Sequence, residues 1–390
     1  MRAAARAIAL ASLAVLSACA TRPVQAPPTV TPPPPVIPPV VPPPPPNALA
    51  AGVTVAAPPT TLDEAAAARV LRAFLTSCPA LRQRQDRSLL SLPGDWAPLC
   101  DAATTVQSGA AAAFFRDRFD WVRVGDGKAF ATGYYIPETA GSRTPAPGYT
   151  VPVYRTPPDL VRCTKIDGTT GRGRIDETGT CVLYFTRAEI DDGALAGKGL
   201  EIAWAADPID LFFIEIQGSG ELRLSDGSVM RIGYDNQNGR DYVAIGRLLR
   251  ERGILPPGGA NMQAIKDWMR ANPDQGRALM RENSSYIFFK ELLGPPLGSL
   301  GYAITPRTTV ATDPNFVPLG APVFLTMDRP EANGLWIAQD VGGAIKGANR
   351  FDTFWGGGPD ATAIAGGMSA SGQALILLPK GVAARALAQP

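Results

Sequence analysis

The chain has 390 residues, and its 37 lysines and arginines are balanced by 35 aspartates and glutamates, for a net charge of +2. A charge this close to neutral lacks the basic surplus of nucleic-acid-binding proteins, so we expect no nucleic-acid partner. The sequence contains no histidine. This absence excludes Ser-His-Asp and Cys-His catalysis and the usual imidazole-bound zinc hydrolases, and we expect neither a metal nor another cofactor.

Residues 1–19 are typical of a signal peptide. Two arginines precede the apolar stretch Ile8–Leu16, which is too short to cross a bilayer as a permanent helix. The stretch ends in Leu-Ser-Ala-Cys, which resembles a bacterial lipobox. We therefore expect Cys19 to be lipidated and to anchor the mature chain to a membrane; an ordinary cleaved signal is the alternative. Ala20 in place of an aspartate favours a periplasmic protein on the inner face of the outer membrane.

A proline-rich segment follows the signal peptide. It has 14 prolines in the 24 residues from Pro23 to Pro46, a composition that favours polyproline II. At about 3.1 Å per residue such a segment reaches roughly 75 Å. We interpret residues 20–59 as a linker that lets the folded part work at a distance from the membrane.

The other four cysteines fall into two local pairs, Cys78 with Cys100 and Cys163 with Cys181. Three connectivities are open to four cysteines. In an exported protein the local pairing, which closes two loops of about twenty residues, is favoured. A metal site is the alternative, and the lack of any C-x-x-C spacing argues against it.

The remaining 330 or so residues suffice for two domains. Thr61-Leu62-Asp63-Glu64 forms a capping box for a helix to about Ser77. Further helices are expected at 102–119, 240–252, 261–270 and 274–281. Strands are expected at 129–136, 151–155, 182–186, 200–205, 211–217, 221–225, 229–234, 323–327, 335–339 and 374–378. Short strands between Gly/Pro turns favour barrels over sandwiches or a parallel sheet.

Three aspartates in the last third of the chain are candidates for chemistry. For an exported protein without nucleotide motifs or histidine, carboxylate chemistry on sugars is the leading function class. Asp340 and Asp352 lie in a glycine-rich context that lets backbone approach a ligand, and Asp313 precedes a proline. Each aspartate alone is more often a turn residue. Asp352 stands out because Phe351, Phe354 and Trp355 lie beside it in the sequence, and burial among aromatic rings raises a carboxyl pKa, as a general acid requires. A purely structural place in the core is the alternative for these rings.

Two upstream segments carry groups that suit a sugar site. Residues 131–138 include Thr132, Tyr134 and Tyr135, and residues 216–220 include Gln217 and Ser219. Aromatic rings stack on pyranose faces, and amide and hydroxyl groups bond to sugar hydroxyls.

Together these segments resemble the membrane-bound lytic murein transglycosylase A (MltA) family. The likeness runs in order from about residue 115 to 379, and its last part, about 300–379, resembles the three-aspartate (3D) domain. The matching segments are 132–135, 186–190, 199–204, 210–220, 233–239, 285–289 and 338–347. This chain departs from the family in having Ile136 where an acidic residue is usual, and one extra residue between Asp340 and Asp352.

The resemblance implies a mainly β fold with flanking helices. It implies a double-psi β-barrel domain from residues 60–147 and 286–390, with a smaller β-barrel domain inserted at about 148–285 and the glycan between them. It also implies that Asp352 is catalytic and that Asp313 and Asp340 shape the site. Substrate contacts are implied at seven residues: Thr132, Tyr134, Tyr135, Gln217, Ser219, Tyr286 and Lys346.

The expected activity is lytic cleavage of peptidoglycan glycan strands, with Asp352 acting first as acid and then as base to form 1,6-anhydro ends. A hydrolytic glycosidase would instead need a second carboxylate, such as Asp340 or Asp360. A non-catalytic wall-binding module or a purely structural lipoprotein are further alternatives. Peptidoglycan is the expected partner besides the membrane, and the sequence identifies no protein partner.

Overall fold

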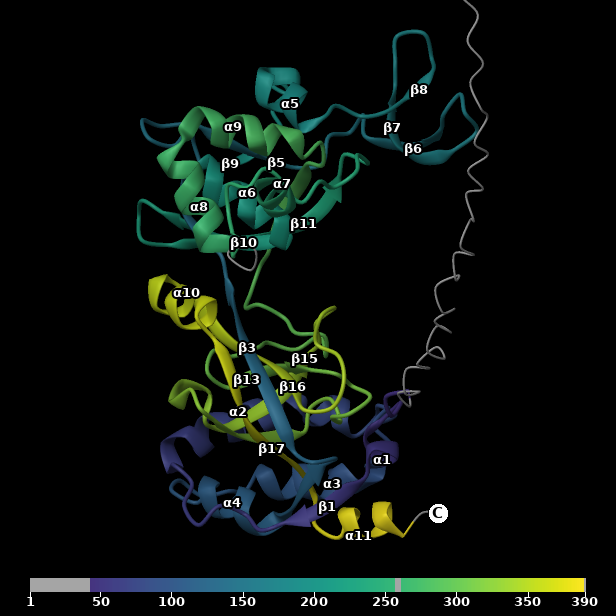
Figure 1. The fold of residues 1–390 in the computed structure, drawn as a ribbon, viewed down its shortest axis with the longest axis vertical. Coiled ribbons are helices and arrows are strands. Elements are labelled where there is room, and N and C mark those ends of the chain that lie inside the picture. The colour runs from purple at the N-terminus through teal and green to yellow at the C-terminus, as the bar shows by residue number, and fades with distance from the viewer. Residues whose placement is uncertain (1–42, 257–260, 389–390) are drawn as a thin grey trace, which may run out of the picture. The chain divides into compact units, whose positions relative to one another are not determined.

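The computed structural model describes residues 43–256 and 261–388. The predicted signal peptide, Cys19 and most of the proline-rich segment lie outside the described residues. In the described part no helix is both long enough and apolar enough to cross a membrane. Figure 1 shows the order of the elements along the chain.

One sheet of eight strands contains both the N-terminal and the C-terminal parts of the described chain. Its order is β1-β2-β17-β14-β15-β13-β16-β3, and β17 also pairs with β3. The six strands from β17 to β3 therefore close into a ring, a barrel with parallel pairs β13/β15 and β16/β3. The eight strands of the whole sheet are β1 (Val53–Ala56), β2 (Phe119–Val124), β3 (Lys128–Ile136), β13 (Thr309–Thr312), β14 (Pro322–Met327), β15 (Gly334–Asp340), β16 (Arg350–Gly357) and β17 (Ser369–Pro379).

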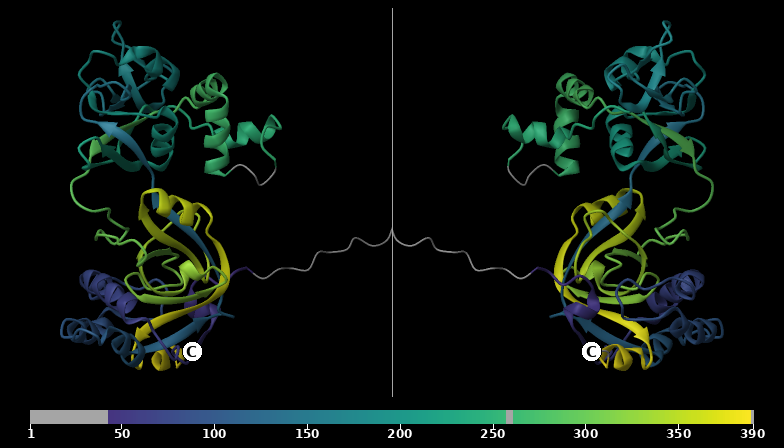
Figure 2. Two further views of the ribbon diagram at one scale, coloured as in Figure 1. Left: turned by 90° about the vertical axis from the view of Figure 1, so that its left-hand side faces the viewer. Right: turned by 90° about the vertical axis from the view of Figure 1, so that its right-hand side faces the viewer.

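Helices cover this barrel and complete its core. Phe74 of α2 packs against Trp96 of α3 and Phe119 of β2, with ring centroids 6.4 and 5.8 Å apart. Helix α10 contacts β3 and β16, and Figure 2 shows it in yellow at one end of the barrel. A disulfide joins Cys78 in α2 to Cys100 in α3. The helices are α1 (Ala48–Ala51), α2 (Glu64–Leu81), α3 (Pro93–Ala103), α4 (Ala111–Arg118), α10 (Pro359–Gly366) and α11 (Val382–Leu387), with a 3-10 turn at Pro330–Ala332.

The middle of the chain builds a second sheet of six strands, in the order β12-β11-β10-β4-β9-β5. A separate three-stranded sheet carries the disulfide between Cys163 and Cys181. The strands of the six-stranded sheet are β4 (Glu138–Ser142), β5 (Val151–Tyr154), β9 (Glu201–Ala205), β10 (Ser219–Leu224), β11 (Val229–Gln237) and β12 (Ile287–Glu291). Those of the three-stranded sheet are β6 (Val161–Thr164), β7 (Thr170–Ile175) and β8 (Cys181–Val182).

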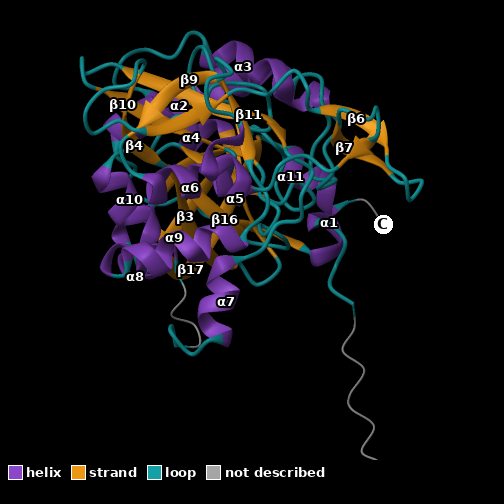
Figure 3. Cartoon of the chain, turned by 90° about the horizontal axis from the view of Figure 1, so that it is seen from above, coloured by secondary structure: helices purple, strands orange, loops and turns teal. Residues whose placement is uncertain are grey.

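Helix α6 contacts β4 and β10 of the six-stranded sheet and also contacts α8. Helix α9 contacts α8 and α7. Figure 3 shows α7, α8 and α9 as neighbours. Buried side chains from α6 to α9, among them Phe212 and Met269, form one hydrophobic cluster. The helices are α5 (Arg187–Glu189) with a π-helical turn at Ile190–Ala194, α6 (Pro208–Gln217), α7 (Ile245–Glu251), α8 (Met262–Ala271) and α9 (Pro273–Glu282).

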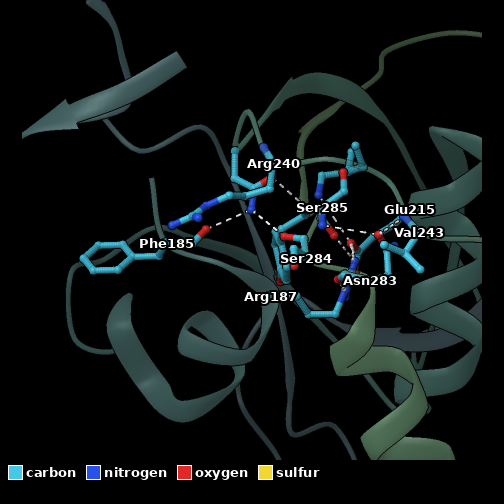
Figure 4. Close-up of polar contacts among 11 residues, drawn as sticks. Phe185, Arg187, Glu215, Arg240, Val243, Asn283, Ser284 and Ser285 are labelled. Carbon is cyan, nitrogen blue, oxygen red and sulfur yellow. Dashed lines mark hydrogen bonds and ion pairs between the residues drawn. The ribbon is translucent and has the colours of Figure 1, made fainter. Parts of the chain in front are cut away.

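A buried ion pair joins distant segments of this middle part (Figure 4). The Arg187 guanidinium donates to the Glu215 carboxylate at 3.2 and 2.5 Å, and to the carbonyl oxygens of Asn283 and Ser285 at 3.2 and 2.8 Å. Both side chains are about 5% exposed or less. A buried charge needs this many partners, so the pair fixes α5 against α6 and the segment before β12.

The hydrophobic cores of the two parts do not mix. The core of the barrel takes residues from 48–131 and 310–383, whereas the three clusters of the middle part take residues from 153–289. Strand β4 pairs with β10 and strand β12 pairs with β11, so the six-stranded sheet runs from Glu138 to Glu291. We call residues 138–291 the inserted part. The sheet thus extends beyond residues 148–285, because the pairing of β4 and β12 with β10 and β11 could not be read from their own sequences.

Several expected elements were wrong. Residues 211–217, expected as a strand, form most of helix α6, where Asp207 accepts bonds from the first turn and left-handed Gly218 ends the helix. An apolar run buried all round gives no period to separate helix from strand. The expected helix at 102–119 is two helices, α3 and α4, because the intervening Gly109 has φ +83°.

Three boundaries also differ. Val53–Ala56, expected in the linker, is β1 and pairs with β2 through its Val-Thr-Val run. Asp63, not Thr61, caps α2, because its carboxylate accepts from the Ala66 N–H. Of the strand expected at 182–186, only Val182 belongs to a strand, β8, and Thr186 caps α5 instead.

Candidate active site

Four neighbouring strands bring two of the three aspartates to one level of the barrel. In the register of the sheet, Asp340 of β15 pairs with Ala311 of β13, Ala311 with Asp352 of β16, and Asp352 with Thr132 of β3. Neighbouring strands lie about 4.8 Å apart, so the backbones of Asp340 and Asp352 are roughly 10 Å apart. Residues 220 positions apart in sequence, Thr132 and Asp352, thus become direct neighbours.

Asp352 is held by a short chain of hydrogen bonds. The Thr132 hydroxyl donates to Asp352 Oδ1 at 2.7 Å, and Arg350 Nη2 donates to the Thr132 hydroxyl at 2.9 Å. An arginine can only donate, so it occupies a lone pair of the hydroxyl and directs the hydroxyl hydrogen to Asp352. No other donor among residues 43–256 and 261–388 bonds to the Asp352 carboxyl. Its Oδ2 is therefore available to carry a proton.

The surroundings raise the pKa of Asp352 above its ordinary value. The largest cause is burial, which disfavours the ionised carboxylate; the Thr132 hydrogen bond and the charge of Arg350 act in the opposite direction. The negative charge of Asp340 adds to the rise. A carboxyl that resists ionisation in this way is suited to donate a proton to a leaving group.

Asp340 differs from Asp352 because its oxygens are satisfied by three donors. Oδ1 accepts from the backbone N–H groups of Ser299 and Val341 at 3.0 and 2.9 Å, and Oδ2 accepts from the Tyr134 hydroxyl at 3.0 Å. The Tyr134 ring lies beside Phe354, with centroids 5.0 Å apart. Burial and the charge of Asp340 raise the pKa of Tyr134, which keeps its hydroxyl protonated as a donor.

Asp313 is buried and supports the loop after β15. It does not lie at the level of the barrel that Asp340 and Asp352 share. Its Oδ2 accepts from the Gly347 N–H at 2.9 Å, and its Oδ1 accepts from the Asn315 N–H at 3.0 Å. The loop that precedes β16 is thereby tied to the end of β13. Asp313 thus contributes to the position of Asp352 only through the backbone.

Two cavities flank β3 beside these residues. The larger, of about 980 Å³, is lined by Thr132 and by residues of α8 and α10. The smaller, of about 430 Å³, is lined by Ser219, Phe354 and Asp340. Both are lined by Tyr134, Tyr135, Pro137 and Gln217, so we treat them as one groove along β3. Asp352 is not in the lining of either cavity, but its neighbour and hydrogen-bond partner Thr132 lines the larger one.

The far wall of the groove is polar and charged. Lys266 Nζ and Arg270 Nη2 both bond to Asp210 Oδ1, at 2.9 and 2.8 Å. The Tyr135 hydroxyl donates to the Met262 sulfur at 3.2 Å, which joins β3 to α8. Rings, amides and charges of this kind along an elongated cavity suit a polyhydroxylated ligand such as a glycan.

Two of the residues expected to contact substrate are not brought to this groove. Tyr286 is buried in the core of the inserted part, with the Arg187 guanidinium 5.0 Å from its ring centroid, and lines a different cavity. Lys346 is exposed in the loop after β15 and lines a third cavity. Sequence proximity to matching motifs could not separate these two from the residues of β3.

Arg350 had no role in the sequence-based expectations, which left open whether the aromatic neighbours bury Asp352 or belong to the core. Residues two apart in a strand share a face, so Arg350 and Phe354 lie on the side of Asp352, whereas Phe351 and Trp355 face the core. The signal was present in the sequence, but it required residues 350–357 to be recognised as a strand. Among the described residues no three acidic, cysteine or histidine side chains are grouped to hold a metal.

Comparisons with known proteins match both the middle and the C-terminal part of the chain. A family model described as the MltA specific insert domain matches residues 130–290, and one described as the 3D domain matches residues 308–378. The membrane-bound lytic murein transglycosylase A of Vibrio cholerae is 35% identical over 252 residues, which cover 62% of each chain. The present chain thus aligns with somewhat less than two thirds of that relative.

Solved structures extend the likeness over more of the chain. A crystal structure of MltA from Neisseria gonorrhoeae is 34% identical, with a TM-score of 0.68, and the match covers 84% of this chain and 93% of that one. A structure of Escherichia coli MltA with bound chitohexaose is 26% identical, with a TM-score of 0.57, over 84% of this chain and 94% of that one.

The fold and the site place the chain among mainly β proteins in which a second sheet is inserted into a barrel that carries paired aspartates. The chain belongs to the membrane-bound lytic murein transglycosylase A family and contains its insert and 3D domains.

Proposed function

We propose that this chain is a lytic transglycosylase of peptidoglycan, with Asp352 as its single general acid and base. The observation that carries the proposal is a half-buried carboxyl of raised pKa, with one free oxygen, hydrogen-bonded to a residue that lines the groove. The names of the relatives, and the sugar chain bound to the Escherichia coli protein, support a glycan as the substrate.

The reaction uses one carboxyl twice. Protonated Asp352 Oδ2 donates to the glycosidic oxygen between N-acetylmuramic acid and N-acetylglucosamine as the bond from that oxygen to C1 breaks. The ionised carboxylate then accepts the proton of the muramic acid C6 hydroxyl, whose oxygen attacks C1. The product carries a 1,6-anhydro ring, no water is consumed, and Asp352 is protonated again.

The neighbours of Asp352 have distinct positioning roles in this proposal. Thr132 and Arg350 fix Oδ1, so that Oδ2 is the oxygen that exchanges the proton. Asp340, held in place by three donors, directs its carboxyl group toward the positive charge that develops at C1. We assign sugar contacts to the groove residues Thr132, Tyr134, Tyr135, Gln217 and Ser219, and none to Tyr286.

We further propose that the six-stranded ring is a double-psi β-barrel. Its two parallel pairs, β13/β15 and β16/β3, within an otherwise antiparallel ring support this. The proposed domains are the barrel, from residues 44–137 and 292–388, and the inserted domain, from 138–291.

The chain is proposed to act in the periplasm, anchored by lipid at Cys19 to the inner face of the outer membrane. The lipobox-like end of the signal segment supports this location, and the proline-rich segment would carry the enzyme toward the wall. Metabolic labelling with radioactive palmitate tests the anchor. Labelling of the wild type and none of Cys19→Ala is the expected result.

Digestion of purified sacculi tests the activity. The compact part, residues 44–390, is compared with its Asp352→Asn variant, and released muropeptides are analysed by mass spectrometry. We expect anhydro ends, one water lighter than hydrolysis products, and a loss of about 10²–10⁴-fold or more in the variant. Asn keeps the shape of the side chain, so binding to sacculi should persist.

Other outcomes would select the alternatives. Reducing ends would identify a hydrolase and a second carboxylate. Release by neither protein, with both still bound to sacculi, would leave a wall-binding module.

A further inference from the structure

A cavity outside the groove is bordered by three cationic side chains without partners. It has a volume of about 250 Å³ and lies between the segment after α2 and the loop after β15. Arg84, Arg87 and Lys346 line it, and all three are exposed. None of them forms an ion pair or a side-chain hydrogen bond with any of the described residues, whereas Arg187, Arg270 and Arg281, which line another cavity, each form an ion pair.

The acidic side chain in the lining does not neutralise these cations. Asp86 directs its carboxylate to its own loop, where it accepts bonds from the N–H and hydroxyl groups of Ser88 and Ser91 and from the Leu90 N–H, at 2.7 to 3.1 Å. With three positive charges against one, the cavity attracts an anion. Arginines bind carboxylates through paired N–H groups, and Lys346 adds a point charge.

The floor of the cavity is apolar, which favours an organic anion over a small inorganic one. The buried residues Trp96 and Leu81 line it, together with three further residues, Pro314, Pro318 and Leu319. A carboxylate on a short aliphatic chain would place its charge at the arginines and its methylene groups on this floor.

The cavity adjoins the groove at Asp340. Ser299 and Val341 line the cavity, and their backbone N–H groups are the ones that hold Asp340 Oδ1. Asp340 in turn lines the groove beside Tyr134. A substituent on a glycan bound in the groove can therefore reach the cations by passing Asp340.

We propose that this cavity binds a carboxylate of the peptide stem carried by a muramic acid residue of the substrate. The inference rests on the proposed function, because it takes peptidoglycan as the ligand of the groove. Muramic acid bears its peptide through a lactyl ether, and such stems combine free carboxylates with aliphatic side chains, the two features that the cavity offers. Arg84 and Arg87 thus act in substrate preference and take no part in bond cleavage.

The test compares two substrates and two double variants of the full-length chain. Glycan strands with their stems, and the same strands after an amidase has removed the stems, are offered to Arg84→Ala/Arg87→Ala. The control is Arg69→Ala/Arg72→Ala, which removes two exposed arginines with the same spacing from α2, away from the cavity. Binding is measured by fluorescence titration, and KM and kcat by release of anhydro ends.

We expect the cavity variant to bind stem-bearing strands about tenfold more weakly, with a higher KM and unchanged kcat. Its affinity for stem-free strands, and both affinities of the control, should stay at the wild-type values. Equal weakening on both substrates, or none on either, would overturn the proposal. Failure of the wild type to cleave either substrate would instead count against the transglycosylase, and the binding comparison would still decide the role of the cavity.

Discussion

At the scale of single residues, the environment of Asp352 links catalysis to stability. Burial raises its pKa, so the folded protein holds the proton more tightly than the unfolded chain does. The contribution of Asp352 to stability is then greatest at low pH and is lost as the pH rises from the ordinary aspartate pKa to the raised folded value. Above the ordinary aspartate pKa, the burial of this carboxyl therefore costs the fold free energy.

Asp352→Asn should therefore raise the free energy of unfolding at pH 7. The gain should disappear at a pH below the ordinary aspartate pKa, where both proteins are neutral at this position. Urea denaturation at several pH values measures it, with Asp241→Asn, an exposed aspartate, as the control. A variant less stable than the wild type at pH 7 would contradict the assigned environment.

The Thr132 hydroxyl stabilises the ionised form of Asp352, and its loss has a predictable sign. Thr132→Val removes a bond that lowers the pKa of Asp352, so that pKa should rise further. Activity requires the protonated acid and falls as the pH passes its pKa, so the alkaline limb of the kcat/KM profile should move to higher pH.

The matched control is Thr362→Val. This threonine lines the same groove, but its hydroxyl bonds to the Gly358 carbonyl instead. Its profile should coincide with that of the wild type. A limb that moves to lower pH in Thr132→Val would be incompatible with the hydrogen bond from Thr132 to Asp352.

At the scale of elements, the approach of α10 to β3 depends on Gly133. A Cβ at this position would lie 2.8 Å from the Ala365 Cα and 3.0 Å from the Met368 Cβ. Gly133→Ala should therefore push α10 away and lower the free energy of unfolding by about 1–3 kcal/mol in denaturant titrations.

Gly366→Ala provides the control within α10 itself. An added Cβ there meets nothing within 4 Å, and this glycine has no positive φ. We expect a change near zero or a gain of up to about 1 kcal/mol, because alanine restricts the unfolded chain. An equal loss of unfolding free energy in both variants would show that substitution anywhere near α10 destabilises the protein, and that the contact between α10 and β3 is not the cause.

Elements with strong local signals were predictable, and those defined by partners were not. The Asp226-Gly227-Ser228 turn between β10 and β11 was found, because its residue types favour a hairpin. The start of α4 has no local cap. The Glu64 carboxylate, 47 residues earlier, accepts from the Ala111 and Ala112 N–H groups at 2.9 Å. A cap supplied from another helix leaves no trace in the neighbouring sequence.

At the scale of the whole molecule, the separation of the cores suggests that the inserted part folds by itself. Its ends, β4 and β12, lie in one sheet with β10 and β11 between them, so they are about 15 Å apart. The fragment 138–291 should show a cooperative thermal transition and form the Cys163–Cys181 disulfide. A fragment without a cooperative transition would show that the insert depends on the barrel.

The sequence by itself determined the chemistry available to this protein. The absence of histidine left carboxylates as the candidates, the cysteine spacing favoured the two local disulfides that the structure contains, and ordered motifs indicated the family. Only the tertiary structure decided which residues meet. Thr132 reaches Asp352 through parallel pairing of β3 and β16, and Tyr286 is removed to another core. Strand register and packing join residues far apart in the chain, and no local pattern encodes them.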